Sequence, residues 1–144
     1  MAFEIKNPPE FTLDVEQWTR ETEADGAQMA SGVIEKLLNN EVYNKASVER
    51  LREVTLVSLP AAGWTGGAAP FVQTVAVSGA TETSEAVLVS ALAEGASLAE
   101  QRAYVKAYGI VCSGTARLGA GTATFRVYKR PATDLVVGLR GVMG

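Results

Sequence analysis

The residue types that carry most enzyme chemistry are scarce in this chain. Its 144 residues include no histidine and a single cysteine, Cys112. A serine or cysteine nucleophile needs a base within hydrogen-bonding distance, and without histidine only a lysine or a carboxylate could supply one. Cys112 itself stands in "GIVCSGTARL", where alternating apolar residues predict a strand that buries the thiol on an apolar face. We therefore assign no catalytic residue and expect a protein that is not an enzyme.

The sequence also gives no motif for a metal or a phosphate group. A zinc site would have no histidine and only one thiol, and "EADG" has neither the spacing nor the final glutamate of a calcium loop. Gly66 and Gly67 are not followed by the Lys-Ser or Lys-Thr of a phosphate-binding loop. We expect no metal and no cofactor, and we interpret these glycines as structural because they adopt backbone angles that other residues resist.

Composition predicts a folded protein and excludes two classes of partner. Hydrophobic residues make up 47% of the chain and charged residues 20%, which is typical of a globular protein. The net charge of −3 gives no reason to expect nucleic acid, whose phosphates attract clusters of Lys and Arg. No apolar run approaches the roughly 18 to 20 residues that span a bilayer, so we expect no membrane insertion.

Charge and composition divide the chain near Thr55. Residues 1–55 carry 11 acidic and 6 basic side chains, a net charge of −5, whereas residues 56–144 carry 5 and 7, a net charge of +2. The second part is also dominated by small and β-branched residues. We predict an α+β chain in three segments: an N-terminal attachment arm (1–26), a helical oligomerisation stalk (27–55) and a β-sandwich head (56–144).

The arm combines a proline pair with apolar side chains. Pro8 and Pro9 deny helical geometry and remove backbone donors, so this segment is restricted to short extended or turn structures. A free tail would seldom be so apolar, and we expect the arm to dock on a partner. The residues expected to make that contact are Phe3, Ile5, Phe11, Leu13 and Trp18.

One long helix is predicted from Ala27 to Val54, because strong helix formers surround a single glycine and no proline occurs. Six of its residues follow the three-four spacing of a heptad seam: Ile34, Leu37, Glu41, Asn44, Val48 and Leu51. So narrow a stripe predicts a short coiled coil, in which an Asn in the seam fixes register and chain number. The alternative is a helix packed on its own β domain, which would also use Val33, Leu38 and Val42.

From Leu56 onward the apolar period changes to two. Six runs rich in β-branched residues, separated by turn signals, predict an antiparallel sandwich, with a barrel as the alternative. The sequence "LGAG" predicts a hairpin turn between the fourth and fifth strands. The expected strands are 55–59, 71–77, 85–92, 109–118, 121–129 and 134–142.

One short helix is predicted to interrupt these strands. Ser97 and Glu100 form a capping-box pattern, and Gly109 stands where a helix often ends in glycine. We expect Leu98, Val105 and Tyr108 to face the sheet from this helix.

The head also carries a candidate binding surface. Arg117 and Arg126 lie on the predicted hairpin, with Lys129 and Arg130 at its end. This cluster suits an acidic glycan or an acidic partner, and the alternative is solvated charge that keeps strand edges apart. Trp64, within "LPAAGWTGGAAPFVQTVAV", keeps two interpretations: packing over an edge of the sandwich, or contact with a ligand or neighbouring subunit.

Residues 56–142 resemble the β domains of structural proteins of tailed bacteriophages and prophages, which recur at the distal part of small trimeric fibres. The resemblance rests on "LPAAGWTGGAAPFVQTVAV", "SLAEQRAYVKAYGIVC", "GTATFRVYKRPATDLVVGL" and the apolar, glycine-rich end of the chain. One departure is "KRPATDL", which has an extra residue before its proline. The acidic arm and the helix before this domain also resemble the plan of short phage fibres.

The resemblance implies a virion protein made in the host cytoplasm. It would be a homotrimer attached to other virion proteins by its arm, with a head directed toward host-surface glycans or another virion protein. Asn44 matches the Asn that such stalks often carry in the seam. The alternatives are a capsid decoration or head fibre protein, a carbohydrate-binding module of a cell-surface protein, and a hydrolase that works without histidine.

Overall fold

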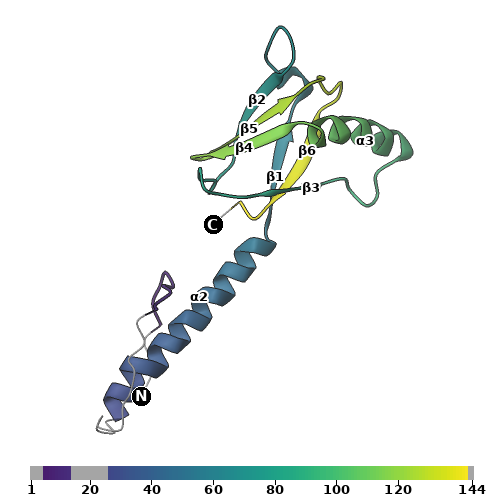
Figure 1. The fold of residues 1–144 in the computed structure, drawn as a ribbon. Helices are drawn as coiled ribbons and strands as arrows, with labels where there is room; N and C mark the ends of the chain where they lie inside the picture. The colour runs from purple at the N-terminus through teal and green to yellow at the C-terminus, as the bar shows by residue number, and fades with distance from the viewer. Residues whose placement is uncertain (1–4, 14–25, 143–144) are drawn as a thin grey trace. The chain divides into compact units, whose positions relative to one another are not determined.

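The structure is a computed structural model that describes residues 5–13 and 26–142. The chain divides into two compact units, residues 1–49 and residues 50–144 (Figure 1). Helices and two antiparallel sheets occur together, so the predicted α+β class is confirmed. The unit boundary falls inside the long helix, a few residues before the boundary near Thr55 that charge and composition indicate.

The long helix is present and covers nearly the predicted range. It begins at Gly26 and ends at Arg52, with one π-helical turn near its start. Arg50 and Arg52 lie in its last turn, where the helix dipole favours positive charge. Its parts are α1 (Gly26–Met29), the π turn η1 (Ala30–Ile34) and α2 (Glu35–Arg52).

The second unit contains the six predicted strands in two three-stranded sheets. Sheet A has the strand order β1-β6-β3 and sheet B the order β2-β5-β4, and every pairing is antiparallel. A short 3₁₀ turn, η2 (Ala61–Gly63), lies between the first two strands. The strands are β1 (Val54–Leu59), β2 (Phe71–Ala76), β3 (Val87–Ser90), β4 (Thr115–Gly119), β5 (Thr122–Val127) and β6 (Leu135–Arg140).

Both sheets bury one face in a single hydrophobic core. The alternation seen in the sequence is the physical cause, since every second side chain of β1, β5 and β6 points inward. Phe125 of β5 is the largest fully buried side chain. The inward residues of these three strands that are buried are Val57, Leu59, Ala123, Phe125, Val127, Leu135, Val137 and Leu139.

Helix α3 (Leu98–Cys112) begins as predicted and ends later. The Ser97 side chain accepts from the Glu100 N–H, and the Glu100 carboxylate accepts from the Ser97 N–H at 2.7 Å, so the capping box is confirmed. Gly109 lies inside the helix, however, and does not end it. Cys112 is therefore the last helical residue and is exposed, which corrects the prediction of a buried strand cysteine.

The face that α3 buries is also corrected. Leu98 and Val105 are 61% and 66% exposed, while Ala107 and Val111 are buried. Tyr108 does pack against the core as predicted. Tyr104 joins it there, and its hydroxyl accepts from the Ala91 N–H at 2.8 Å and donates to the Val136 carbonyl at 3.0 Å. The buried stripe thus follows the positions 104, 107, 108 and 111.

The predicted hairpin turn is confirmed. Gly119 of β4 pairs with Thr122 of β5, which leaves Ala120 and Gly121 as the two turn residues. Gly121 has a φ of +68°, a backbone angle that glycine adopts without strain.

A pair of glycine substitutions tests this packing. A Cβ at Gly114 would overlap the Arg126 carbonyl, whereas a Cβ at Gly109 meets nothing within 4 Å. Gly114→Ala is predicted to lower the free energy of unfolding by about 1–3 kcal/mol through overpacking. Gly109→Ala is predicted to raise it by about 0.5–1 kcal/mol, because glycine weakens a helix interior. Urea denaturation followed by circular dichroism measures both, and a stabilised Gly114→Ala would contradict the packing described.

Candidate interaction surfaces

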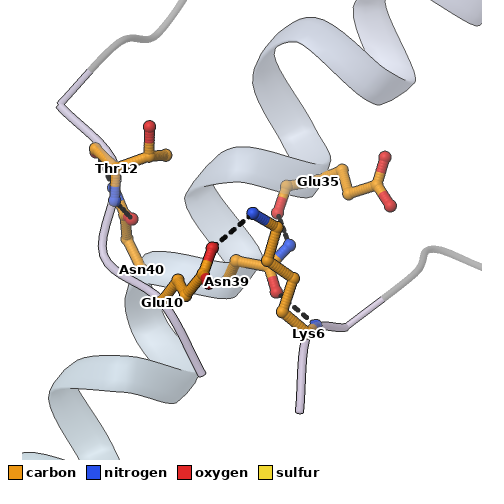
Figure 2. A network of polar contacts seen from close by, with 6 residues as sticks. All are labelled: Lys6, Glu10, Thr12, Glu35, Asn39 and Asn40. Carbon is orange, nitrogen blue, oxygen red and sulfur yellow. Dashed lines mark hydrogen bonds and ion pairs between the residues drawn. The ribbon is translucent and has the colours of Figure 1, made fainter. Parts of the chain in front are cut away.

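The arm folds back onto the long helix within the N-terminal unit. The Asn39 side chain accepts the backbone N–H of Lys6 at 2.8 Å and donates to the Glu35 carbonyl at 2.9 Å (Figure 2). Asn39 is buried despite being polar, and these bonds satisfy both ends of its amide. Lys6 also forms an exposed ion pair with Glu10 at 2.6 Å.

Asn40 makes a second, two-way clasp on the arm. Its Oδ1 accepts the Thr12 N–H and its Nδ2 donates to the Thr12 carbonyl, each at 2.8 Å (Figure 2). Beside this pair, the rings of Phe11 and Tyr43 lie 5.6 Å apart at 54°. Two adjacent asparagines therefore hold the arm through hydrogen bonds to its backbone.

The predicted arm contacts are only partly within the described residues. Phe11 contacts Tyr43 of α2 although it is 46% exposed, and Ile5 and Leu13 are 43% and 90% exposed. Phe3 and Trp18 lie outside the described residues. The arm thus contacts the chain's own helix, which the sequence analysis did not anticipate, and its attachment to another protein stays a prediction.

The predicted seam of the helix stays uncovered. All six of its residues are exposed, and the four apolar members, Ile34, Leu37, Val48 and Leu51, are between 37% and 60% exposed. With about 100° per residue, Asn39 and Tyr43 lie more than about 120° round the helix from the centre of the seam, whereas Asn40 lies only about 70° from it. The arm therefore reaches from the opposite face of the helix to the edge of the seam. Val33, Leu38 and Val42, the residues of the alternative packing, are half-buried.

Trp64 is a packing residue and not a surface contact. Its side chain is 3% exposed and belongs to the hydrophobic core, so the packing interpretation holds and the possible surface contact does not. The indole N–H has no hydrogen-bond partner among the described residues. An unpaired buried donor costs about 1–3 kcal/mol, so the burial of the large ring must offset that cost.

Residues in the connection between β5 and β6 hold the loop around Trp64 in place. The Asp134 carboxylate accepts the Ala61 N–H at 2.8 Å, and the Arg130 guanidinium donates to the Gly66 carbonyl. The same guanidinium stacks over the Phe71 ring, 4.5 Å from its centroid. The loop is therefore a fixed closure of the β unit and has no need of a ligand to shape it.

The glycines of this loop serve that closure. A Cβ at Gly63 would overlap the Gln73 amide, and Gly66 has a φ of +117°. A larger residue at Gly63 would displace the end of the Gln73 side chain, and other residues rarely adopt the φ of Gly66. The structural interpretation of the glycine-rich stretch accounts for both.

The four basic residues predicted as one cluster line two separate hollows. Arg117 and Arg126 lie with Thr115, Thr122 and Thr124 in an open hollow of about 440 Å³ on sheet B. Lys129 and Arg130 line another, of about 820 Å³, against α3.

The hollow beside α3 contains two basic residues that sequence reasoning missed. Arg102 and Lys106 line it together with Lys129, Arg130 and several alanines, and no acidic side chain is among the lining residues. The missed signal was the spacing of four residues between Arg102 and Lys106, which places both on one face of a helix. This spacing indicates a shared face only if residues 102 and 106 both lie in a helix, as they do in α3.

The described residues include a tyrosine whose pKa is raised. Burial raises the pKa of Tyr108 to about 12, and a hydrogen bond to Cys112 acts in the same direction, so the phenol stays neutral at physiological pH. Within residues 5–13 and 26–142, no three acidic, cysteine or histidine side chains gather as a metal site. In the same part of the chain, no helix has the length and apolar character needed to cross a membrane.

Comparison of the chain with protein-family models, with curated proteins and with solved structures gives no match.

The clasp of the arm can be tested at Asn40. Asn40→Ala removes two hydrogen bonds to Thr12, each worth about 1 kcal/mol. Hydrogen exchange of the Thr12 amide, followed by NMR, is predicted to accelerate roughly tenfold or more, since 1.4 kcal/mol is a factor of ten. Asn44→Ala, an exposed asparagine on the seam, is the matched control and should leave this exchange rate unchanged. Equal rates in both variants would contradict the clasp.

Proposed function

We propose that this protein is a non-enzymatic structural component of a bacteriophage virion. In this proposal it forms a homotrimeric fibre or baseplate appendage. The arm attaches it to other virion proteins, the helix trimerises, and the β unit contacts host-surface glycans or another virion protein. The resemblance of residues 56–142 to phage β domains supports the class of protein, and the uncovered seam supports the assembly.

The uncovered seam of α2 is the observation that carries the trimer. A helix of a single-chain protein normally turns its apolar stripe toward its own core. Here the arm is held by Asn39 and Asn40, while the apolar seam residues remain exposed. An exposed stripe with heptad spacing is favourable only when another helix covers it.

The centre of the seam argues for a specific chain number. Glu41 and Asn44 are exposed and interrupt the apolar ends of the stripe. A polar residue in a coiled-coil core costs stability and fixes register and oligomeric state. In this proposal, Glu41 and Asn44 lower the stability of the coiled coil and fix the number of helices in it. A fibre with identical heads needs such a fixed number.

Substitution of the seam tests the trimer. Leu37→Asp with Leu51→Asp is predicted to reduce the mass from three chains to one, because charges would be buried against apolar side chains. Light scattering with mass determination measures this, and the β signal in circular dichroism should persist. Leu98→Asp with Val105→Asp is the matched control, since those residues of α3 are as exposed. A wild-type monomer at micromolar concentration would remove the trimer from the proposal.

Imaging tests the virion role itself. Antibodies against residues 50–144 are predicted to label purified particles of the phage or prophage that encodes the chain, at the tail or baseplate. Electron microscopy with gold-labelled antibody gives the position. Label on the capsid would establish the alternative, a head fibre or decoration protein. Particles without label would contradict a virion component and favour a cell-surface carbohydrate-binding module.

A further inference from the structure

A groove runs along α3 within the second compact unit. Two hollows, of about 820 and 380 Å³, lie against this helix and share Lys106, Ile110 and Lys129, so they are parts of one groove. On the helix side its lining extends over residues 99–113, a rise of about 20 Å at 1.5 Å per residue. The other wall is the segment 128–133 that follows β5. We call this feature the α3 groove.

The α3 groove has an unbalanced positive charge. Its lining includes no acidic side chain and four basic ones: Arg102, Lys106, Lys129 and Arg130. The acidic residues nearest to these in sequence are Glu100 and Asp134. Both carboxylates accept hydrogen bonds from backbone N–H groups outside the groove, at Ser97 and Ala61. Neither carboxylate therefore belongs to the lining.

Three of the four cations have no partner within the protein. The Arg130 guanidinium is held by the Gly66 carbonyl and the Phe71 ring. No ion pair joins Arg102, Lys106 or Lys129 to any residue that the structure describes. Because Arg102 and Lys106 are four residues apart on a helix, their like charges repel each other. A bound anion would remove that repulsion.

Hydrogen bonds fix both walls of the α3 groove. The Tyr104 hydroxyl bonds to the backbone of Ala91 and Val136 and so holds α3 against the sheet. Arg130 and Asp134 hold the opposite segment against the loop around Trp64. A ligand would therefore meet a preformed site, and little conformational entropy would be lost on binding.

The groove also offers apolar surface and an exposed aromatic ring. Ala99, Ala103 and Ile110 line the larger hollow. Tyr128, which is 67% exposed, lines the smaller one. A tyrosine ring provides a flat apolar surface on which another ring can stack. Thr133 adds a hydroxyl that can donate or accept a hydrogen bond.

We propose that the α3 groove binds an acidic oligosaccharide, with its carboxylate or sulfate groups beside Arg102, Lys106 and Lys129 and a sugar ring against Tyr128. This inference rests on the proposed function, in which the β unit contacts host-surface glycans, and it names the site and the class of glycan. Most of the groove's lining is apolar with a few polar groups, as in other ligand sites of 300–1,000 Å³.

Two other anionic partners fit these observations less well. A nucleic acid strand carries a phosphate on every nucleotide and rewards many cations, whereas this chain has a net charge of −3 and the groove has three unpaired cations. An acidic peptide would contact the cations but would leave the exposed ring of Tyr128 without a role. Both serve as competing probes in the test.

Binding by the full chain tests the proposal. The probes are an array of carboxylated and sulfated oligosaccharides, each beside its neutral counterpart, with oligo-dT and a polyglutamate peptide on the same array. The protein is predicted to bind acidic oligosaccharides and not their neutral counterparts. The affinity, measured by biolayer interferometry, should fall as the salt concentration rises, because exposed charges are screened.

Charge reversal locates the site. Lys106→Glu with Lys129→Glu is predicted to weaken binding of the acidic oligosaccharide by at least about tenfold, because charge-assisted hydrogen bonds are replaced by repulsion. Lys45→Glu with Arg140→Glu is the matched control, since it changes the net charge equally at exposed residues outside the groove. The control should bind as the unmodified chain does, and thermal melting followed by circular dichroism checks that both variants fold.

Substitution of the ring separates a glycan from an acidic peptide. Tyr128→Ala is predicted to weaken binding of the acidic oligosaccharide roughly two- to tenfold, whereas Tyr128→Phe keeps the ring and should retain the affinity. Equal affinities for the unmodified chain and Tyr128→Ala would contradict the stacking of a sugar on this ring.

The outcomes separate this proposal from the virion role. Failure to bind any acidic oligosaccharide, equal binding of the neutral counterparts, or equal losses in the charge-reversed variant and its control would overturn the groove as a glycan site. Tighter binding of polyglutamate or oligo-dT would overturn it in favour of an acidic peptide or a nucleic acid. Antibody labelling of particles decides the virion role independently. Binding that the groove variant loses and the control retains would establish the site.

Discussion

The burial of one face of each sheet in a shared core is the constraint on which the β unit depends. Every second side chain of β1, β5 and β6 points inward, and Phe125 is the largest that is fully buried. The last turn of the long helix belongs to the same unit, since Leu51 packs beside Gly141. A single residue, Glu53, joins that turn to the first strand.

The residues of the long helix, and the two faces of each sheet, differ in what they contact. On the helix, Asn39, Asn40 and Tyr43 hold the arm, whereas the seam residues stay exposed. In the β unit, both sheets turn one face to a shared core, yet only sheet B has a polar outer face. Burial accounts for the inner faces within one chain. The seam and strand residues such as Leu56 and Val87 keep exposed apolar side chains, and contact of the seam with further copies is a proposal.

Patterns among neighbouring residues predicted the strands, the hairpin turn and the start of α3. Alternation located six strands, "LGAG" the hairpin turn and Ser97 with Glu100 the start of α3, because turns, caps and sheet faces depend on neighbouring residues. The predicted end of α3 was wrong because "GIVC" contains β-branched residues typical of a strand. Burial of Val111 against the core keeps that segment helical, and such tertiary packing overrides propensity. The buried stripe was wrong at Leu98 and Val105, since helix positions one residue apart face in different directions.

The basic residues show why a candidate site is harder to predict than a fold. Arg117, Arg126, Lys129 and Arg130 are close in sequence, but successive strand residues point to opposite faces and the chain leaves the sheet after Val127. They therefore reach two hollows, and one of these is completed by Arg102 and Lys106 from a helix formed earlier in the chain. Arg130 is partly occupied in fixing the loop at Gly66 and Phe71. Arg102, Lys106 and Lys129 are thus the other basic side chains of this hollow, and tertiary structure brings them together.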